Sequence, residues 1–382
     1  MRLKNGLMNF SLLLAGIMVA LLLLEIILRV TYLLQPSELV PTQISGLPYE
    51  NRPSSAFWRY DYGLSWIKYT KNSYGFRSPE ISVEKPKSTR RILVLGDSVA
   101  FGGNVRNQET FSAQLEAFLN PMSAFGSWQV INTGTSSYNF HNYWSMLMGK
   151  GAQFNPDAVI ICITANDFEI DRGNDITRPP SASATALPRT VSLLLKKTKT
   201  FLGKSYLLDH VKKKFNYGQE EAKLSPEEKQ VVQLEVESVF KNDPSTRQAF
   251  TWLAKNEGRN IFALYKNLLY SRNMKWDVVQ PIMANFGTWS KQHQVPIYLF
   301  FCPTRVHCVP GNNSTVPEPL LLSMAFQNGL HPVPMIDAFQ EHYRQGDQAL
   351  FARSDYLHPL APGHTVIAQR LCKRLIDDGL IK

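Results

Sequence analysis

A serine and a histidine in this chain lie in the kinds of motif that acyl-transfer chemistry uses. Ser98 ends a Gly-Asp-Ser tripeptide, and His358 follows Asp355 by three positions. A serine hydroxyl becomes a good nucleophile when a base removes its proton, and a histidine oriented by a carboxylate is such a base near neutral pH. These residues therefore predict a catalytic triad of Ser98, Asp355 and His358.

Two further residues offer hydrogen-bond donors to an oxyanion. Gly134 has a backbone N–H with no side chain in the way, and Asn166 has a side-chain amide. With the N–H of Ser98, they predict an oxyanion hole. Taken singly, each of these motifs is also compatible with an ordinary turn, a helix cap or a solvated loop, so the prediction rests on their combination.

Two other polar residues are assigned no chemistry. His364 lies at the start of the last predicted helix, where we expect it to pack or to cap rather than to act as a second base. Asp337 ends a predicted strand, and we expect it to cap.

The motifs follow short apolar runs that are typical of buried strands. These runs are residues 92–95, 128–131, 158–163, 296–301 and 333–336. Apolar residues recur at helical spacing in three segments that lie between or after these strands: residues 110–119, 142–150 and 365–376. Strands that alternate with helices predict an α/β fold with a parallel sheet and helices on both faces. In such sheets the chemistry collects beyond the carboxyl ends of the strands, where all four motifs fall.

In this order, the motifs resemble the blocks of the SGNH (GDSL-like) hydrolase family. The Gly-Asp-Ser of Ser98 resembles the first block, Gly134 the second, Asn166 the third and residues 355–358 the last. The resemblance covers residues 91–170 and about 295–378. One departure is Thr164, which stands where the family usually has glycine.

The resemblance implies a flavodoxin-like three-layer α/β/α fold with a parallel sheet. It also implies hydrolysis or transfer of acyl esters without a metal or other cofactor, and an oxyanion hole formed by Ser98, Gly134 and Asn166. Residues 72–77 resemble a segment that precedes the first block in membrane-tethered members; a simple turn is the alternative.

The N-terminus predicts a membrane anchor. An apolar run over residues 7–24 is about as long as a spanning helix and follows Arg2 and Lys4. No small-x-small cleavage site follows it, which favours an uncleaved anchor over a signal peptide. The positive-inside tendency then puts the N-terminus in the cytoplasm and the catalytic domain on the extracytoplasmic side, periplasmic or extracellular.

The rest of the chain divides by composition. Residues 1–34 are the predicted cytoplasmic tip and anchor, and residues 35–89, rich in Pro, Ser and aromatic residues, are a predicted stalk. Residues 90–169 and 272–382 form the hydrolase domain, and residues 170–271 a helical insertion. Within the insertion, the lysine-rich residues 191–215 favour a packed helix with a solvated basic face slightly over a helix in a membrane interface.

Charge and cysteine content exclude some classes of protein. The net charge is +10, but the sequence contains no zinc-finger or RNA-binding motif. We therefore expect an anionic membrane surface rather than nucleic acid as the partner of the basic residues. Four cysteines in 382 residues do not make a disulfide scaffold. Whether Cys302 and Cys308 pair stays open, as does the oligomeric state.

Three functions fit these observations. The first is a membrane-anchored esterase that hydrolyses an O-acyl ester, with O-acetyl as one candidate, of a cell-envelope glycan or lipid. The second is an O-acyltransferase with the same triad, because only the acceptor differs. The third is a non-catalytic glycan-binding or scaffolding protein of the same fold.

Overall fold

The computed structural model describes residues 2–34, 37–61, 65–124, 126–164, 167, 237, 276–308, 318–345, 350–351 and 357–381. They belong to two compact units. One contains helix α1 (Arg2–Leu34), and the other contains the described residues from 38 onward.

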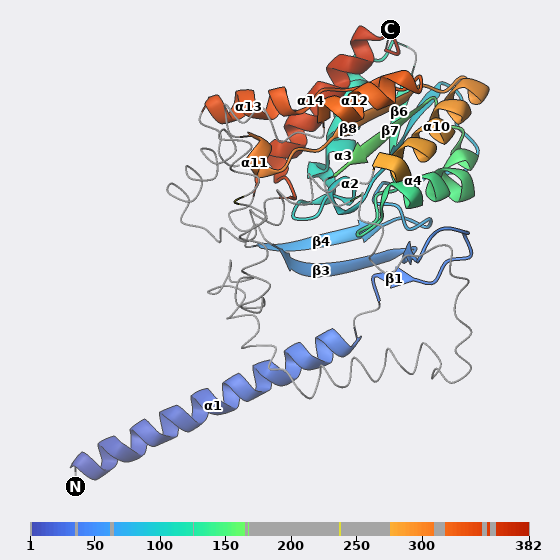
Figure 1. The fold of residues 1–382 in the computed structure, drawn as a ribbon. Helices are drawn as coiled ribbons and strands as arrows, with labels where there is room; N and C mark the ends of the chain where they lie inside the picture. The colour runs from blue at the N-terminus through green and yellow to red at the C-terminus, as the bar shows by residue number, and fades with distance from the viewer. Residues whose placement is uncertain are drawn as a thin grey trace. The chain divides into compact units, whose positions relative to one another are not determined.

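Five parallel strands form the main sheet, in the order β6-β5-β7-β8-β9 (Figure 1). They are β5 (Thr89–Leu95), β6 (Ser127–Asn132), β7 (Ala158–Ile163), β8 (Ile297–Phe301) and β9 (His331–Pro332). Every residue of β7 and β8 is buried, as expected of strands covered on both faces. Counted along the chain, the order is 2-1-3-4-5, the flavodoxin-like order, in which the chain reverses direction across the sheet between β5 and β7. The predicted parallel α/β sheet is confirmed.

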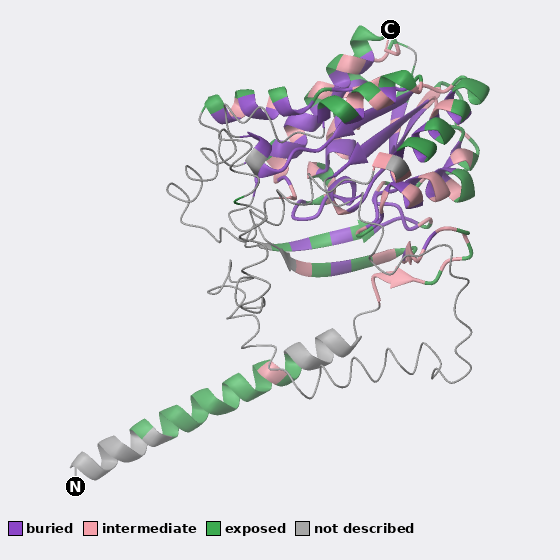
Figure 2. Ribbon diagram, in the orientation of Figure 1, coloured by how far each residue is buried: buried purple, intermediate pink, exposed green. Residues whose placement is uncertain are grey.

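Helices cover both faces of this sheet. Ile92 and Val94 of β5 face one layer, whereas Leu93 and Leu95 face the other, because successive side chains of a strand point to opposite sides. The first layer contains α3 (Phe111–Leu119), α13 (Ile336–Arg344) and α14 (Ala361–Asp377). The second contains α4 (Phe140–Met146), α10 (Trp276–His293) and α12 (Glu318–Gln327). Figure 2 shows the buried strands between helices whose outer surfaces are exposed.

The last strand differs from its prediction. β9 consists of His331–Pro332 only, so the predicted strand over residues 333–336 is wrong by two positions. The chain turns there because Glu318 accepts the N–H groups of Met335 and Ile336, where α13 begins. Asp337 accordingly lies in the first turn of α13 and pairs with Arg370, rather than ending a strand.

The described residues between 38 and 89 are packed on the α/β sheet unit, which corrects the prediction of a stalk. They form the antiparallel pairs β1 (Leu39–Val40) with β2 (Glu50–Asn51) and β3 (Ser55–Asp61) with β4 (Ser65–Lys71). Phe57 and Tyr69 lie opposite each other and are buried, and the Tyr69 ring stacks on Phe101 at 5.6 Å between centroids. This aromatic contact fixes the β3–β4 hairpin to the segment that follows Ser98.

Helix α1 is 33 residues long and exposes apolar side chains from Phe10 to Ile27. The part of the chain that the structure describes holds no helix that is both long and apolar enough to qualify as a membrane span. The predicted helical insertion, residues 170–271 including 191–215, lies outside the described residues except for Glu237.

Candidate active site

Ser98 and His358 meet at the carboxyl end of β5, although 260 residues separate them. His358 Nε2 lies 2.8 Å from Ser98 Oγ. Ser98 is the first residue of the short helix α2 (Ser98–Phe101), and His358 lies in the loop before α14. Because β5 and β7 flank the point where the chain reverses direction, this is the edge where α/β sheets bind ligands. A hydroxyl and an imidazole at this distance can act as a nucleophile and its general base.

Local sequence explains why Ser98 points to this edge. Asp97 caps α2, since its Oδ1 accepts the Val99 N–H at 2.8 Å. Gly102 ends the helix with φ 84°, a left-handed conformation that glycine adopts without strain. The next residue, Gly103, passes so close to His358 that a Cβ there would lie 3.3 Å from His358 Cδ2. The turn after the nucleophile therefore packs against the imidazole.

The other predicted site residues have different outcomes. Asp355 and Asn166 lie outside the described residues, so their roles stay predictions. The N–H of Gly134 donates to Asn132 Oδ1 at 2.9 Å, so this donor is already engaged. A Cβ on Gly134 would lie 2.2 Å from Phe101 N, which gives the glycine a packing role against α2. Its role as an oxyanion donor also stays a prediction.

Two buried carboxyl groups, those of Asp97 and Asp167, belong to the hydrogen-bond network next to Ser98. Asp97 Oδ2 accepts the Thr164 hydroxyl at 3.0 Å and is 3.3 Å from Ser98 Oγ. The Thr164 N–H in turn donates to Asp167 Oδ2 at 2.7 Å. Burial raises the pKa of both carboxyls, and the charge of Asp97 raises the pKa of Asp167 further. Hydrogen bonds favour the ionised form of both carboxyls, but the pKa of Asp167 is raised well above its usual value and that of Asp97 less so. Asp97, which the Val99 N–H and the nearby charge of His358 stabilise, is therefore the better placed of the two to bear the charge.

Arg77 is a residue of the site that the sequence did not identify. It is 2% exposed, and its guanidinium donates to the carbonyls of Phe101, Gly102 and Val105. The same group lies over the Tyr69 ring, 4.3 Å from the centroid. Arg77 thus holds the turn after α2 in place from the side of the β3–β4 hairpin. Arg77 ends the segment of residues 72–77 that resembles one in membrane-tethered members of the SGNH family. The sequence does not show where the guanidinium of Arg77 points.

His364 is fully buried near the start of α14. Its Nδ1 accepts the Phe111 N–H at 3.1 Å, so it caps the start of α3. Burial, followed by the nearby charges of Arg77 and His358, lowers the pKa of His364 to about 3. The prediction that His364 packs rather than acts as a base is confirmed.

The cysteines are all buried and free, so Cys302 and Cys308 are unpaired in this structure. Cys308 Sγ donates instead to the Thr304 carbonyl, 3.3 Å away. Within the described ranges, no three His, Cys, Asp or Glu side chains are grouped as metal ligands.

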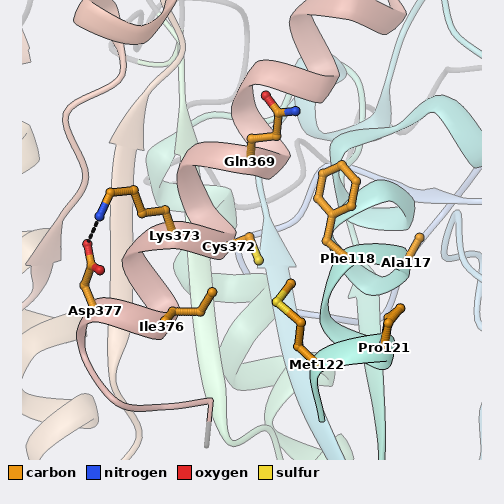
Figure 3. Close-up of a pocket in the computed structure, with 9 residues that line it drawn as sticks. All are labelled: Ala117, Phe118, Pro121, Met122, Gln369, Cys372, Lys373, Ile376 and Asp377. Atoms are coloured by element: carbon orange, nitrogen blue, oxygen red, sulfur yellow. Dashed lines mark hydrogen bonds and ion pairs between the residues drawn. The ribbon is translucent and has the colours of Figure 1, made fainter.

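A pocket of about 670 Å³ opens elsewhere, between α3 and α14 (Figure 3). Its walls are mostly apolar and include Phe118, Met122 and Ile376, and the Lys373–Asp377 ion pair lies at its side. Neither Ser98 nor His358 lines this pocket, so it is separate from the candidate active site.

Comparisons with known proteins give similarity to solved structures only. No protein-family model matches the chain, and no curated protein sequence is detectably similar to it. A catalytic mutant of the acetylxylan esterase Axe2 from Geobacillus stearothermophilus is 14% identical, with a TM-score of 0.39 over 76% of this chain and 96% of that one. The structure of TesA is 11% identical, with a TM-score of 0.40 over 75% and 98% of the two chains. A lipase/acylhydrolase from Enterococcus faecalis is 13% identical, with a TM-score of 0.38 over 76% and 96%. TM-scores this low do not establish a shared fold, so the functional interpretation rests on the geometry of the site.

Proposed function

We propose that this chain is a membrane-anchored serine esterase of the SGNH (GDSL-like) type. The observation that supports it most is the 2.8 Å contact between His358 Nε2 and Ser98 Oγ at the carboxyl edge of a parallel sheet. A serine and a histidine in this contact have the geometry that acyl transfer needs, which the non-catalytic alternative does not require.

The reaction proceeds through an acyl-enzyme. Ser98 Oγ attacks the acyl carbon of the ester while His358 Nε2 takes the hydroxyl proton. The C–O bond to the alcohol then breaks, and His358 returns the proton to the departing alkoxide. Water, deprotonated by His358, attacks the acyl-serine, which releases a carboxylic acid and restores Ser98. In this proposal Asp355 orients His358, and the Ser98 N–H and Asn166 stabilise the oxyanion. The Gly134 N–H joins them only by leaving Asn132 Oδ1, to which it donates in this structure.

The substrate that we propose is an O-acylated glycan or lipid of the cell envelope, because the anchor holds the domain at a membrane. Helix α1 supports the anchor through the large apolar side chains that it exposes between Phe10 and Ile27. The catalytic domain would then lie on the extracytoplasmic side.

Ester turnover tests the catalytic part of the proposal. The full-length protein should hydrolyse a short-chain aryl ester, and Ser98→Ala should lower kcat by at least about a thousandfold. Ser127→Ala, an exposed serine at the start of β6, is the matched control and should retain full activity. Equal turnover by the Ser98→Ala variant would contradict the proposal.

Membrane fractionation tests the anchor separately. The full-length chain should stay with the membrane pellet after an alkaline carbonate wash, whereas a chain without residues 2–34 should not. In sealed inside-out vesicles, the catalytic domain should be protected from added protease. Its digestion there would contradict the proposed orientation.

A further inference from the structure

The hydroxyl of Ser98 has two acceptors within reach but only one proton. His358 Nε2 lies 2.8 Å from Ser98 Oγ, and Asp97 Oδ2 lies 3.3 Å from it. A serine that donates to the histidine is aligned to lose its proton to the base. A serine that donates to the aspartate holds its proton on the wrong side for that transfer.

Thr164 donates to the same oxygen of Asp97 that competes for the serine. Thr164 Oγ1 lies 3.0 Å from Asp97 Oδ2. Both residues are fully buried. The Thr164 backbone is held in turn by its N–H bond to Asp167. The hydroxyl therefore lies at the end of β7 within hydrogen-bond distance of Asp97 Oδ2, and the same side chain also interacts with the Asp167 carboxyl.

We infer that Thr164 is a positioning residue, which occupies Asp97 Oδ2 so that Ser98 donates its proton to His358. A carboxylate oxygen that already accepts one hydrogen bond attracts a second donor less strongly, so the serine hydroxyl is left to the imidazole. The inference rests on the proposed esterase function. It also gives a physical role to the threonine at a position where the SGNH family usually has glycine, a residue that cannot donate from a side chain.

Removal of the hydroxyl tests this role. Thr164→Val keeps the shape of the side chain but deletes the donor, and Thr164→Ser keeps the donor. We expect Thr164→Val to lower kcat for an aryl ester by between about tenfold and a hundredfold, with KM within about twofold of wild type. Thr164→Ser should restore kcat to within about threefold of wild type. The rate of inactivation by a fluorophosphonate should follow kcat, because both reactions need the same activated serine.

A matched control separates positioning from stability. Thr365→Val, on α14, also deletes a threonine hydroxyl that donates a side-chain hydrogen bond, to Gln114 at 2.7 Å, and should lower stability without changing kcat. If Thr164→Val does not fold, Thr164→Ala replaces it in the same comparison.

The Asp97→Asn background tests the competing acceptor itself. Asparagine can keep the cap of α2 with its oxygen and presents an NH₂ group where Asp97 Oδ2 was, so Ser98 has no second acceptor there. In that background Thr164→Val should cost less than about threefold in kcat, and the two substitutions should be non-additive.

Three results would each overturn the inference. They are a wild-type kcat in the Thr164→Val variant, a kcat in Thr164→Ser that is as low as in Thr164→Val, and an equal loss of kcat from Thr164→Val in the Asp97→Asn background. Failure of the wild type to hydrolyse the ester or to react with the fluorophosphonate would instead contradict the proposed function.

Discussion

His358 and His364 belong to one short stretch of chain, yet their environments are opposite. His358 is half-buried in a loop and directs Nε2 to the Ser98 hydroxyl at 2.8 Å. His364 is fully buried at the start of α14, where Nδ1 accepts the Phe111 N–H and the ring stacks on that of Phe111. The same side chain is thus the proposed base in one place and a neutral structural acceptor in the other. The role of each histidine depends on the exposure of its imidazole to solvent and on the group that its ring nitrogen contacts.

The largest effect expected from this comparison is on catalysis. His358→Ala should lower kcat for an aryl ester by at least about a thousandfold, because it removes the imidazole nitrogen that lies 2.8 Å from Ser98 Oγ. Thermal unfolding should change little, since the imidazole is half-buried. An active His358→Ala variant beside a folded but inactive His364→Ala variant would mean that the roles of the two histidines are reversed.

The next effect is on stability. His364→Ala should lower the free energy of unfolding by about 2–4 kcal/mol, because it leaves a cavity and an unpaired Phe111 N–H. The kcat of the folded fraction should stay within about twofold of wild type. His364→Asn, whose side-chain oxygen can still accept from Phe111, should lose less stability than His364→Ala. Equal losses in denaturant titrations would show that the hydrogen bond is not what the imidazole contributes.

An effect of similar size appears only in acid. The pKa of His364 is about 3 in the folded protein, against an ordinary value of 6.5. Between these values the unfolded chain binds a proton that the folded protein does not, so the contribution of His364 to stability falls as pH falls below 6.5. At pH 4 this loss amounts to about 3 kcal/mol. The loss should be absent in His364→Asn, while Asp97, Asp167 and Glu318 titrate alike in both proteins. If the difference in unfolding free energy between the wild type and His364→Asn is the same at pH 7 and pH 4, the lowered pKa of His364 is contradicted.

The sequence predicted the sheet well where burial is complete. All six residues of β7 are apolar and buried, and its predicted bounds agree with the structure. Ser98 and His358 were found because each lies in a motif with a chemical meaning. The β3–β4 hairpin was missed because Trp58 and Trp66 are about half exposed on its outer face, while Phe57 and Tyr69 are buried on its inner face. With aromatic residues on both faces, the alternation that marks a half-buried strand disappears.

Contacts between distant segments explain the remaining differences. Arg77 acquires its role from backbone carbonyls more than 20 residues further along the chain, and no local pattern encodes the direction of its side chain. Thr164 was noticed only as a departure from the glycine of the resembled family. Its hydroxyl matters because β5 and β7 are neighbours in the sheet, which places Asp97 beside it. Such roles follow from topology rather than from residue type.

Covalent labelling of the nucleophile tests the central claim most directly. The full-length protein is treated with a fluorophosphonate, digested, and the modified peptide is identified by mass spectrometry. We expect one adduct, on Ser98, that is absent from Ser98→Ala, forms at least about a hundredfold more slowly in His358→Ala, and forms at the wild-type rate in the folded His364→Ala protein. An unlabelled wild-type protein, or equal labelling of the Ser98→Ala variant at another residue, would contradict the assignment of Ser98 and His358 as nucleophile and base.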